Sequence, residues 1–310
     1  MATTIFAFAR YLRLKVLVSF FRLAVKLLTP APKARPDRVL SIPSRDKRRS
    51  IKAHLYTPPA KDAGAQARVP GPVLLNFYGS GFALPLHGAD DGFCRLVATK
   101  AGYAVLDVEY RLGPEWPFPA AINDVEDAVR YVLDRPEEFN SSQVSLSGFS
   151  SGGTLALIAP TLFPPGCFRS VIAFYPATDL AADPKLRKAP APDAKPRSTF
   201  LTGIFREAYI GDRNPRDPRI SPIFADTSNY PANMLVLTGD QDTSALEAED
   251  LAERAKREGQ ASGRNVVIRR MKGCGHAFDK KSKVSALVQA RDEAYGLAVD
   301  MLRTAASHRI

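Results

Sequence analysis

Short apolar runs alternate with segments of helical periodicity between residues 73 and 271. The runs are rich in Val, Leu, Ile and Phe and are bounded by Gly, Pro or charged residues, which is typical of buried strands. They lie at residues 73–77, 103–108, 143–147, 170–175, 234–239 and 266–271, with helical segments near 92–100 and 120–133. Two earlier runs, 38–42 and 51–56, flank a charged turn and predict an antiparallel hairpin at one edge. Strands that alternate with helices predict an α/β fold whose mostly parallel sheet has helices on both faces.

A long insertion separates the run that ends near residue 175 from the run that starts near residue 234. It begins with a segment rich in Pro, Ala and Lys at 183–198. It continues with apolar residues at helical spacing, which are Leu201, Ile204, Phe205, Ala208 and Tyr209. A structureless loop of that length is uncommon in a compact domain, so we expect a lid at about residues 177–230. The alternative is a poorly ordered linker.

The first 36 residues form a segment of unusual charge. They hold seven basic residues and no acidic residue, and so supply most of the net charge of +11. This local concentration argues against a broad nucleic-acid-binding surface. The chain has 310 residues and 45% hydrophobic content, so residues 37–310 can bury one large core and are expected to form one domain.

Within residues 1–36, Lys15, Arg22 and Lys26 fall on one stripe of a helix, with apolar residues around it. The longest uncharged apolar run is too short for a membrane span or a signal peptide. We expect this basic amphipathic segment to cap the pocket of the domain, with peripheral membrane contact through residues 1–30 as an addition. A purely interfacial helix and a transit peptide are the alternatives.

The cysteines indicate neither disulfides nor a metal site. Cys94, Cys167 and Cys274 are an odd number without a framework spacing. Such usage fits a cytoplasmic protein, which the N-terminal segment can associate with a membrane. The sequence has no Gly-rich phosphate-binding loop and no cluster of metal ligands, so we expect no cofactor and no metal ion.

The most specific motif is Gly148-Phe149-Ser150-Ser151-Gly152, between an apolar run and a helical pattern. A Gly-x-Ser-x-Gly motif between a strand and a helix is the nucleophile elbow of α/β-hydrolases. The strained turn lifts the serine hydroxyl out of the sheet edge, and a Cβ at Gly148 or Gly152 would crowd the approach of strand and helix. We therefore predict that Ser150 is a nucleophile. The loose pattern also occurs by chance, but its context favours the elbow.

A serine nucleophile needs a base, usually a histidine, which an acid orients. In this fold the base follows the serine along the chain. His54 and His87 precede Ser150, and His308 lies next to the C-terminus, which leaves His276. It lies in a loop of small residues after the run 266–271, so we predict that His276 is the general base.

The acid should follow the preceding predicted strand, which is the run 234–239. Asp240 and Asp242 both occur there, and either can orient the imidazole. We favour Asp242, because the aspartate nearer to the strand is better placed to brace the turn.

The predicted oxyanion hole consists of backbone N–H groups aimed at the developing negative charge. One donor is the residue after the nucleophile, which is Ser151. The others come from a Gly-rich turn that follows the run 73–77, where Gly79 and Ser80 can expose their amides. A flexible strand-to-helix connection is the alternative interpretation of this turn.

Two segments resemble a known family. Tyr78-Gly79-Ser80-Gly81-Phe82 resembles the His-Gly-Gly-Gly-Phe turn of hormone-sensitive-lipase-like esterases, which include the arylacetamide deacetylases. The segment from Glu109 to Glu115 resembles that family's Asp-Tyr-Arg-Leu-Ala-Pro-Glu. The resemblance runs from Val73 to His276. It implies the α/β-hydrolase fold, with a mostly parallel central sheet and a helical cap formed by the insertion and N-terminal helices. It also implies esterase activity.

This sequence departs from the family pattern at the oxyanion turn. Tyr78 stands where the family has the histidine that braces the turn, and Ser80 stands where the family has glycine. Phe149-Ser150-Ser151 also replaces the usual Asp-Ser-Ala. These departures put the geometry of the oxyanion hole in question without removing the nucleophile or the base.

Together the residues predict a serine hydrolase that cleaves carboxylic esters of small to medium, mainly apolar substrates through an acyl-enzyme. Its partner is then a small-molecule ester and no nucleic acid. A biosynthetic acyl-transfer, lactonising or cyclising enzyme with the same triad is the first alternative, because an alcohol can attack the acyl-enzyme when a lid excludes water. A non-catalytic ligand receptor is the second, since a fold does not determine function.

Overall fold

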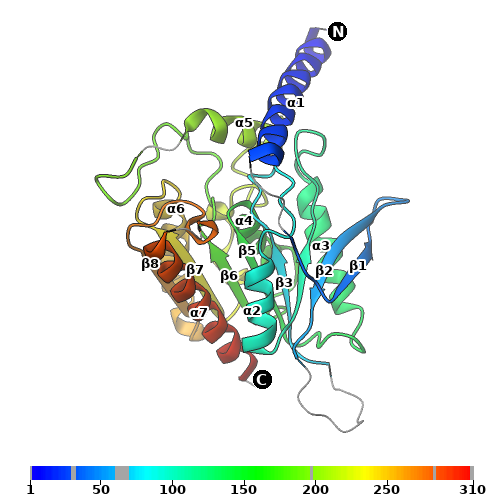
Figure 1. The fold of residues 1–310 in the computed structure, drawn as a ribbon, viewed down its shortest axis with the longest axis vertical. Coiled ribbons are helices and arrows are strands. Elements are labelled where there is room, and N and C mark those ends of the chain that lie inside the picture. Colours follow the sequence, from blue (N-terminus) through cyan, green and yellow to red (C-terminus); the bar gives the residue numbers. More distant parts are fainter. Residues whose placement is uncertain (1, 29–32, 60–69, 196–197, 282–283, 308–310) are drawn as a thin grey trace.

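The computed structural model describes residues 2–28, 33–59, 70–195, 198–281 and 284–307. An eight-stranded sheet of order β1-β2-β4-β3-β5-β6-β7-β8 runs through it (Figure 1). The strands are β1 (Arg38–Pro43), β2 (Ser50–Tyr56), β3 (Val73–Phe77), β4 (Ala104–Val108), β5 (Val144–Phe149), β6 (Ser170–Phe174), β7 (Asn233–Gly239) and β8 (Asn265–Met271). β1 and β2 form the predicted antiparallel hairpin at one edge, and the pairs from β4 to β8 are all parallel.

Helices cover both faces of the sheet, as the sequence predicts. They are α1 (Ala2–Leu28), α2 (Asp91–Ala101), α3 (Ala120–Leu133), α4 (Ser151–Ile158), α5 (Thr199–Ile210), α6 (Ala245–Glu258) and α7 (Ser285–Ser307). α2 and α7 pack side by side on one face, while α3, α4 and α6 pack on the other (Figure 1). The sequence analysis named no helix at α7, because several of its buried positions are alanines, which give a weak hydrophobic period.

The central strands contribute side chains to both core layers. In β3, Leu75 packs with the α3 and α4 layer, whereas Leu74 packs with the α2 and α7 layer. In β7, Val236 packs with the α3 and α4 layer, and Leu237 packs with the α2 and α7 layer. Successive residues of a strand point to opposite faces, so a strand buried on both sides is mostly apolar. This explains why apolar residues predominate in these strands, although β3 also contains the buried Asn76.

The helix α1 packs against α5 above the sheet. Leu14 and Val18 are buried in a small cluster with Ala83, Ile204 and Ala208. The N-terminal part of α1 extends beyond the rest of the protein (Figure 1). Among the residues that the structure describes, no helix has the length and apolar character that a bilayer crossing requires.

The turn between β5 and α4 brings three backbone segments into close contact. Ser150 lies between the two elements with φ of 52°, in the left-handed region that non-glycine residues rarely adopt. A Cβ on Gly152 would lie 1.9 Å from the carbonyl oxygen of Phe77, and a Cβ on Gly148 would lie 2.2 Å from that of Gly152. Both positions therefore require glycine.

We expect Gly152→Ala to lower the free energy of unfolding by roughly 3 kcal/mol or more, because backbone atoms of β3 cannot yield to the new methyl group. Gly92→Ala is the matched control. Gly92 lies in α2 with no atom within 4 Å of its added Cβ, so this change should raise stability by about 0.5 to 1 kcal/mol. Denaturant unfolding followed by circular dichroism measures both effects, and equal midpoints for Gly152→Ala and the wild type would contradict the steric argument.

Candidate active site

Three side chains from three loops meet at the carboxyl edge of the sheet. Ser150 follows β5, Asp242 follows β7 and His276 follows β8. Ser150 Oγ lies 2.7 Å from His276 Nε2, and His276 Nδ1 lies 2.7 Å from Asp242 Oδ2. Parallel strands end at the same edge, so residues far apart in the sequence come within hydrogen-bond distance there. This arrangement has the geometry of a serine nucleophile with a base and an orienting acid.

The structure distinguishes the two aspartates, of which the sequence favours Asp242. The Asp242 carboxylate is buried; it contacts the imidazole through Oδ2 and accepts a hydrogen bond from the Ser244 amide through Oδ1. The backbone amide of Asp240 donates to the Met271 carbonyl, and Asp240 Oδ1 has no hydrogen-bond partner among the described residues. Asp242 is therefore the aspartate that the structure brings to His276.

The ring of Tyr175 packs against His276, with ring centroids 4.9 Å apart. The Tyr175 hydroxyl donates to Asp279, which also accepts from the Tyr295 hydroxyl at 2.8 Å. Lys280 Nζ lies 2.9 Å from Asp279 Oδ2. Burial opposes the ionisation of Asp279, but Lys280 and the two hydroxyls outweigh it and lower the pKa of this carboxyl. The sequence does not predict this network, because its residues share no motif and meet through tertiary packing.

The turn predicted to form the oxyanion hole lies directly against Ser150. A Cβ on Gly79 would come within 3.1 Å of the Phe149 carbonyl oxygen and 3.5 Å of Ser150 Cβ. The sequence predicts that the Ser80 N–H group is free to bind an oxyanion. In the structure this group instead donates a hydrogen bond to Ser151 Oγ at 2.9 Å. A serine in place of the family's alanine after the nucleophile supplies this acceptor.

A cavity of about 340 Å³ opens beside Ser150 and His276. Its walls include Phe82, Ala177, Leu180, Arg187, Leu201 and Phe205, and most of these belong to the insertion after β6. Gly81 has φ of 58°, and a Cβ there would lie 2.7 Å from the Phe205 ring, so its lack of a side chain lets α5 approach the turn. A larger cavity of about 1040 Å³ lies between α1, α2 and α7, and none of Ser150, Asp242 and His276 lines it.

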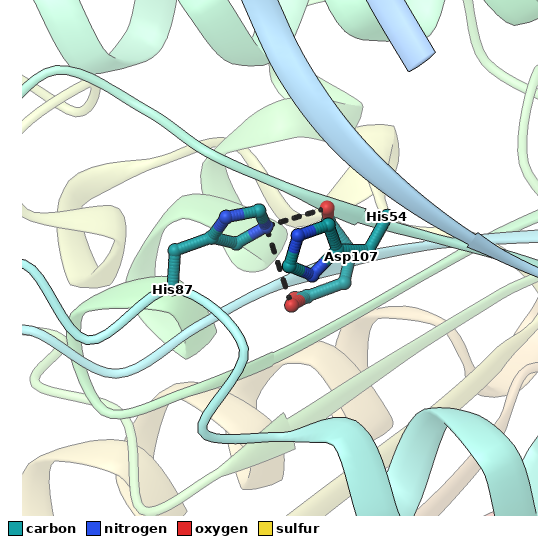
Figure 2. A group of neighbouring side chains, drawn as sticks. All are labelled: His54, His87 and Asp107. Carbon is teal, nitrogen blue, oxygen red and sulfur yellow. Dashed lines mark hydrogen bonds and ion pairs between the residues drawn. The ribbon is translucent and has the colours of Figure 1, made fainter. Parts of the chain in front are cut away.

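Within the described part of the chain, one group of residues has metal-ligating atoms within 4.8 Å of one another, namely His54, His87 and Asp107. Figure 2 shows the two imidazoles beside Asp107. Their rings stack with centroids 4.1 Å apart and an angle of 27°, which sets their in-plane lone pairs side by side instead of converging on an ion. His87 Nε2 instead lies 2.9 Å from the Asp107 carbonyl oxygen, to which it can donate.

The charges at this group also favour a neutral histidine pair. Burial lowers the pKa of His54 to about 4, and burial likewise lowers the pKa of His87. Burial raises the pKa of Asp107 to about 6. Two uncharged, stacked imidazoles therefore fill a buried space beneath the loop that precedes α2, and we assign no metal ion or cofactor to them.

The chain was compared with known families, proteins and structures. A family described as the alpha/beta hydrolase fold matches residues 74–280. The ethyl acetate hydrolase of Pseudomonas putida is 26% identical over 277 residues, which cover 86% of this chain and 83% of that protein. The carboxylesterase NlhH of Mycobacterium tuberculosis is 30% identical over 171 residues, 52% of this chain and 53% of that protein. The solved structure of EstE1, a thermostable carboxylesterase from a metagenomic library, is 26% identical, with a TM-score of 0.77 over 95% of this chain and 98% of that one.

These relatives are esterases, which confirms the resemblance to hormone-sensitive-lipase-like esterases and the predicted fold. The solved structure of the Pyrobaculum calidifontis esterase is also similar. It is 26% identical, with a TM-score of 0.75 over 95% of this chain and 94% of that one. The family match covers more than half of the chain, which therefore belongs to the α/β-hydrolase fold family.

Proposed function

We propose that this protein is a serine carboxylesterase that cleaves esters of small to medium, mainly apolar substrates through an acyl-enzyme. The observation that carries the proposal is the hydrogen-bonded chain from Ser150 Oγ through His276 to Asp242 beside a cavity. The ester hydrolases among its relatives support the same reaction class. A non-catalytic receptor has no need for this alignment of hydroxyl, imidazole and carboxylate.

In this mechanism Ser150 Oγ attacks the ester carbonyl while His276 Nε2 accepts the hydroxyl proton. The tetrahedral intermediate collapses as the imidazolium returns that proton to the departing alcohol. Water then attacks the acyl-enzyme with the same assistance and releases the carboxylic acid. Asp242 keeps the imidazole oriented and stabilises its cationic form without taking the proton itself.

The cavity supports the proposed substrate class. A volume of about 340 Å³ suits an acyl or alcohol group of modest size, since small-molecule pockets begin at roughly 300 Å³. Leu180, Leu201 and Phe205 offer apolar surface in this cavity. The burial of an apolar substrate group against them therefore favours substrate binding. We propose that the insertion at about residues 177–230 is the lid that supplies these walls.

We propose that α1 belongs to this cap. Its Phe21 ring packs edge-on against Phe205, with centroids 6.0 Å apart, and Phe205 lines the cavity. Arg22 donates to both carboxylate oxygens of Glu115 at 2.8 and 2.9 Å and to the Ala83 carbonyl at 2.8 Å. These contacts tie α1 to the domain beside the substrate site.

The opposite face of α1 supports membrane contact as an addition. It exposes an apolar stripe along the helix, formed by Phe8, Leu12, Val16, Phe20, Leu23 and Leu27. The basic residues of α1 contribute less to membrane attraction than the sequence suggests, because acidic side chains neutralise several of them. Lys15 and Arg22 pair with Glu115, and Arg13 pairs with Glu207. We therefore propose that apolar burial, rather than charge, drives any contact with a lipid surface.

Replacement of Ser150 by alanine tests the proposed function. We expect Ser150→Ala to lower kcat by on the order of 10⁴ to 10⁶ and to abolish fluorophosphonate labelling, since it removes the attacking oxygen. Hydrolysis of p-nitrophenyl esters and mass spectrometry of the labelled protein measure the two effects. Ser142→Ala, at an exposed loop serine, should change neither. Full labelling of Ser150→Ala at another serine would reject the assignment.

The acid is tested by a pair of variants. Asp242→Asn should lower kcat by on the order of 10² to 10⁴, because the amide favours the wrong imidazole tautomer. Asp240→Asn should lower kcat less than about tenfold, since this carboxylate does not contact the imidazole. Both variants should first show wild-type circular dichroism. The reverse ranking of their rates would transfer the role to Asp240.

Removal of residues 1–28 tests the cap. We expect the truncation to change the preference for acyl chain length and to lower the melting temperature, because Phe205 loses Phe21 and the partners of Leu14 and Val18 become exposed. A Leu12→Ser, Val16→Ser double variant on the outer face is the control. It should keep the chain-length preference and weaken binding to phosphatidylcholine vesicles. Unchanged selectivity and melting temperature after truncation would exclude the cap.

A further inference from the structure

Three buried hydroxyl groups meet behind the oxyanion turn. Ser80 Oγ lies 2.8 Å from the Tyr110 hydroxyl and 3.2 Å from Ser151 Oγ, and the Tyr110 hydroxyl lies 3.2 Å from Ser151 Oγ. The Tyr110 hydroxyl also donates to the Tyr78 carbonyl at 2.6 Å, and the two tyrosine rings stack with centroids 4.6 Å apart. Each of Ser80, Ser151 and Tyr110 is less than 4% exposed. The position of Ser151 Oγ is therefore fixed by neighbours and closed to water.

This fixed oxygen accepts the hydrogen of the Ser80 amide at 2.9 Å. Ser80 belongs to the turn that lies against Ser150, where amide donors stabilise an oxyanion in this family of folds. A backbone amide has a single hydrogen, so a strong bond to Ser151 Oγ and a strong bond to a substrate oxygen exclude each other. The side chain of Ser151 thus competes with the substrate, although the backbone amide of the same residue is a predicted donor to it.

We propose that the Ser151 hydroxyl sequesters the Ser80 amide and that the oxyanion must displace it during acylation, which makes Ser151 a positioning residue that limits the rate. The proposal rests on the proposed function, because it needs a tetrahedral intermediate at Ser150. A neutral carbonyl is too weak an acceptor to win the exchange, whereas an oxyanion forms a charge-assisted bond. The competition therefore weakens the stabilisation of the transition state and not the binding of the substrate. It should lower kcat and leave KM nearly unchanged.

The direction of the effect follows from this exchange. Loss of one oxyanion donor costs about 10² to 10³ in kcat, which is the upper limit of what a freed amide can restore. In the wild type the developing oxyanion already displaces the Ser151 hydroxyl in part, so part of this factor in kcat is present before any substitution. Removal of the hydroxyl should therefore raise kcat by about tenfold.

Ser151→Ala tests the proposal, because it removes Oγ and keeps the backbone amide. We expect kcat for p-nitrophenyl acetate and butyrate to rise about tenfold with KM within about twofold of the wild type. The inhibition constant of phenylboronic acid, whose adduct with Ser150 is tetrahedral and anionic, should fall by a similar factor. Ser151→Cys, whose slightly larger side chain still fills this space but offers a weak acceptor, should give a smaller rise in kcat.

Tyr110→Phe is the matched control. It removes another hydroxyl of the same cluster but leaves the bond between the Ser80 amide and Ser151 Oγ, so kcat should not rise. A folded Ser151→Ala with unchanged or lower kcat would overturn the proposal, as would an equal rise in Tyr110→Phe. If the wild type hydrolyses esters and is labelled at Ser150, such a result rejects only the role of the Ser151 hydroxyl and leaves the proposed function standing. A wild type that does neither would reject both.

Discussion

Where α4 begins, its backbone lies so close to the ends of β3 and β5 that no side chain fits between them. Gly148 and Gly152 permit this contact, and Ser150 adopts a left-handed conformation as a result. Backbone strain of this kind persists only when surrounding packing holds it, and α4 is buried over its whole length. The position of the Ser150 hydroxyl is therefore determined by main-chain contacts, and the loops after β7 and β8 bring their side chains to it.

The sequence predicted the parts of this protein that depend on local pattern. The central strands were recognisable because burial on both faces makes their residues mostly apolar, and the elbow because its glycines are sterically required. The helix α7 was not recognisable, since alanines such as Ala294 and Ala298 give little contrast to the polar face. The sequence favoured Asp242 over Asp240 only through the position of each in the turn, whereas the coordinates show directly which carboxylate faces the imidazole.

Charge was the least predictable property, because its effect depends on partners far away in the sequence. The basic residues of α1 suggested a positively charged surface, yet Glu115 and Glu207 pair with four of them. Behind His276, the Lys280 ammonium group lies 2.6 Å from an Asp90 carboxylate oxygen and 2.9 Å from an Asp279 carboxylate oxygen. Burial alone would lower the pKa of its ammonium group, but Asp90 and Asp279 raise it, so the lysine stays charged. It thereby holds Asp279, and through it Tyr175, against the His276 imidazole.

The strand order has a consequence for how the enzyme forms during synthesis. From β5 onward, each new strand pairs with the strand translated just before it, so the sheet can extend as the chain leaves the ribosome. The elbow belongs to the strand that starts this series, whereas His276 follows the strand that ends it. The Ser150 hydroxyl therefore gains its neighbouring imidazole only after β8, the last strand of the sheet along the chain, has been translated.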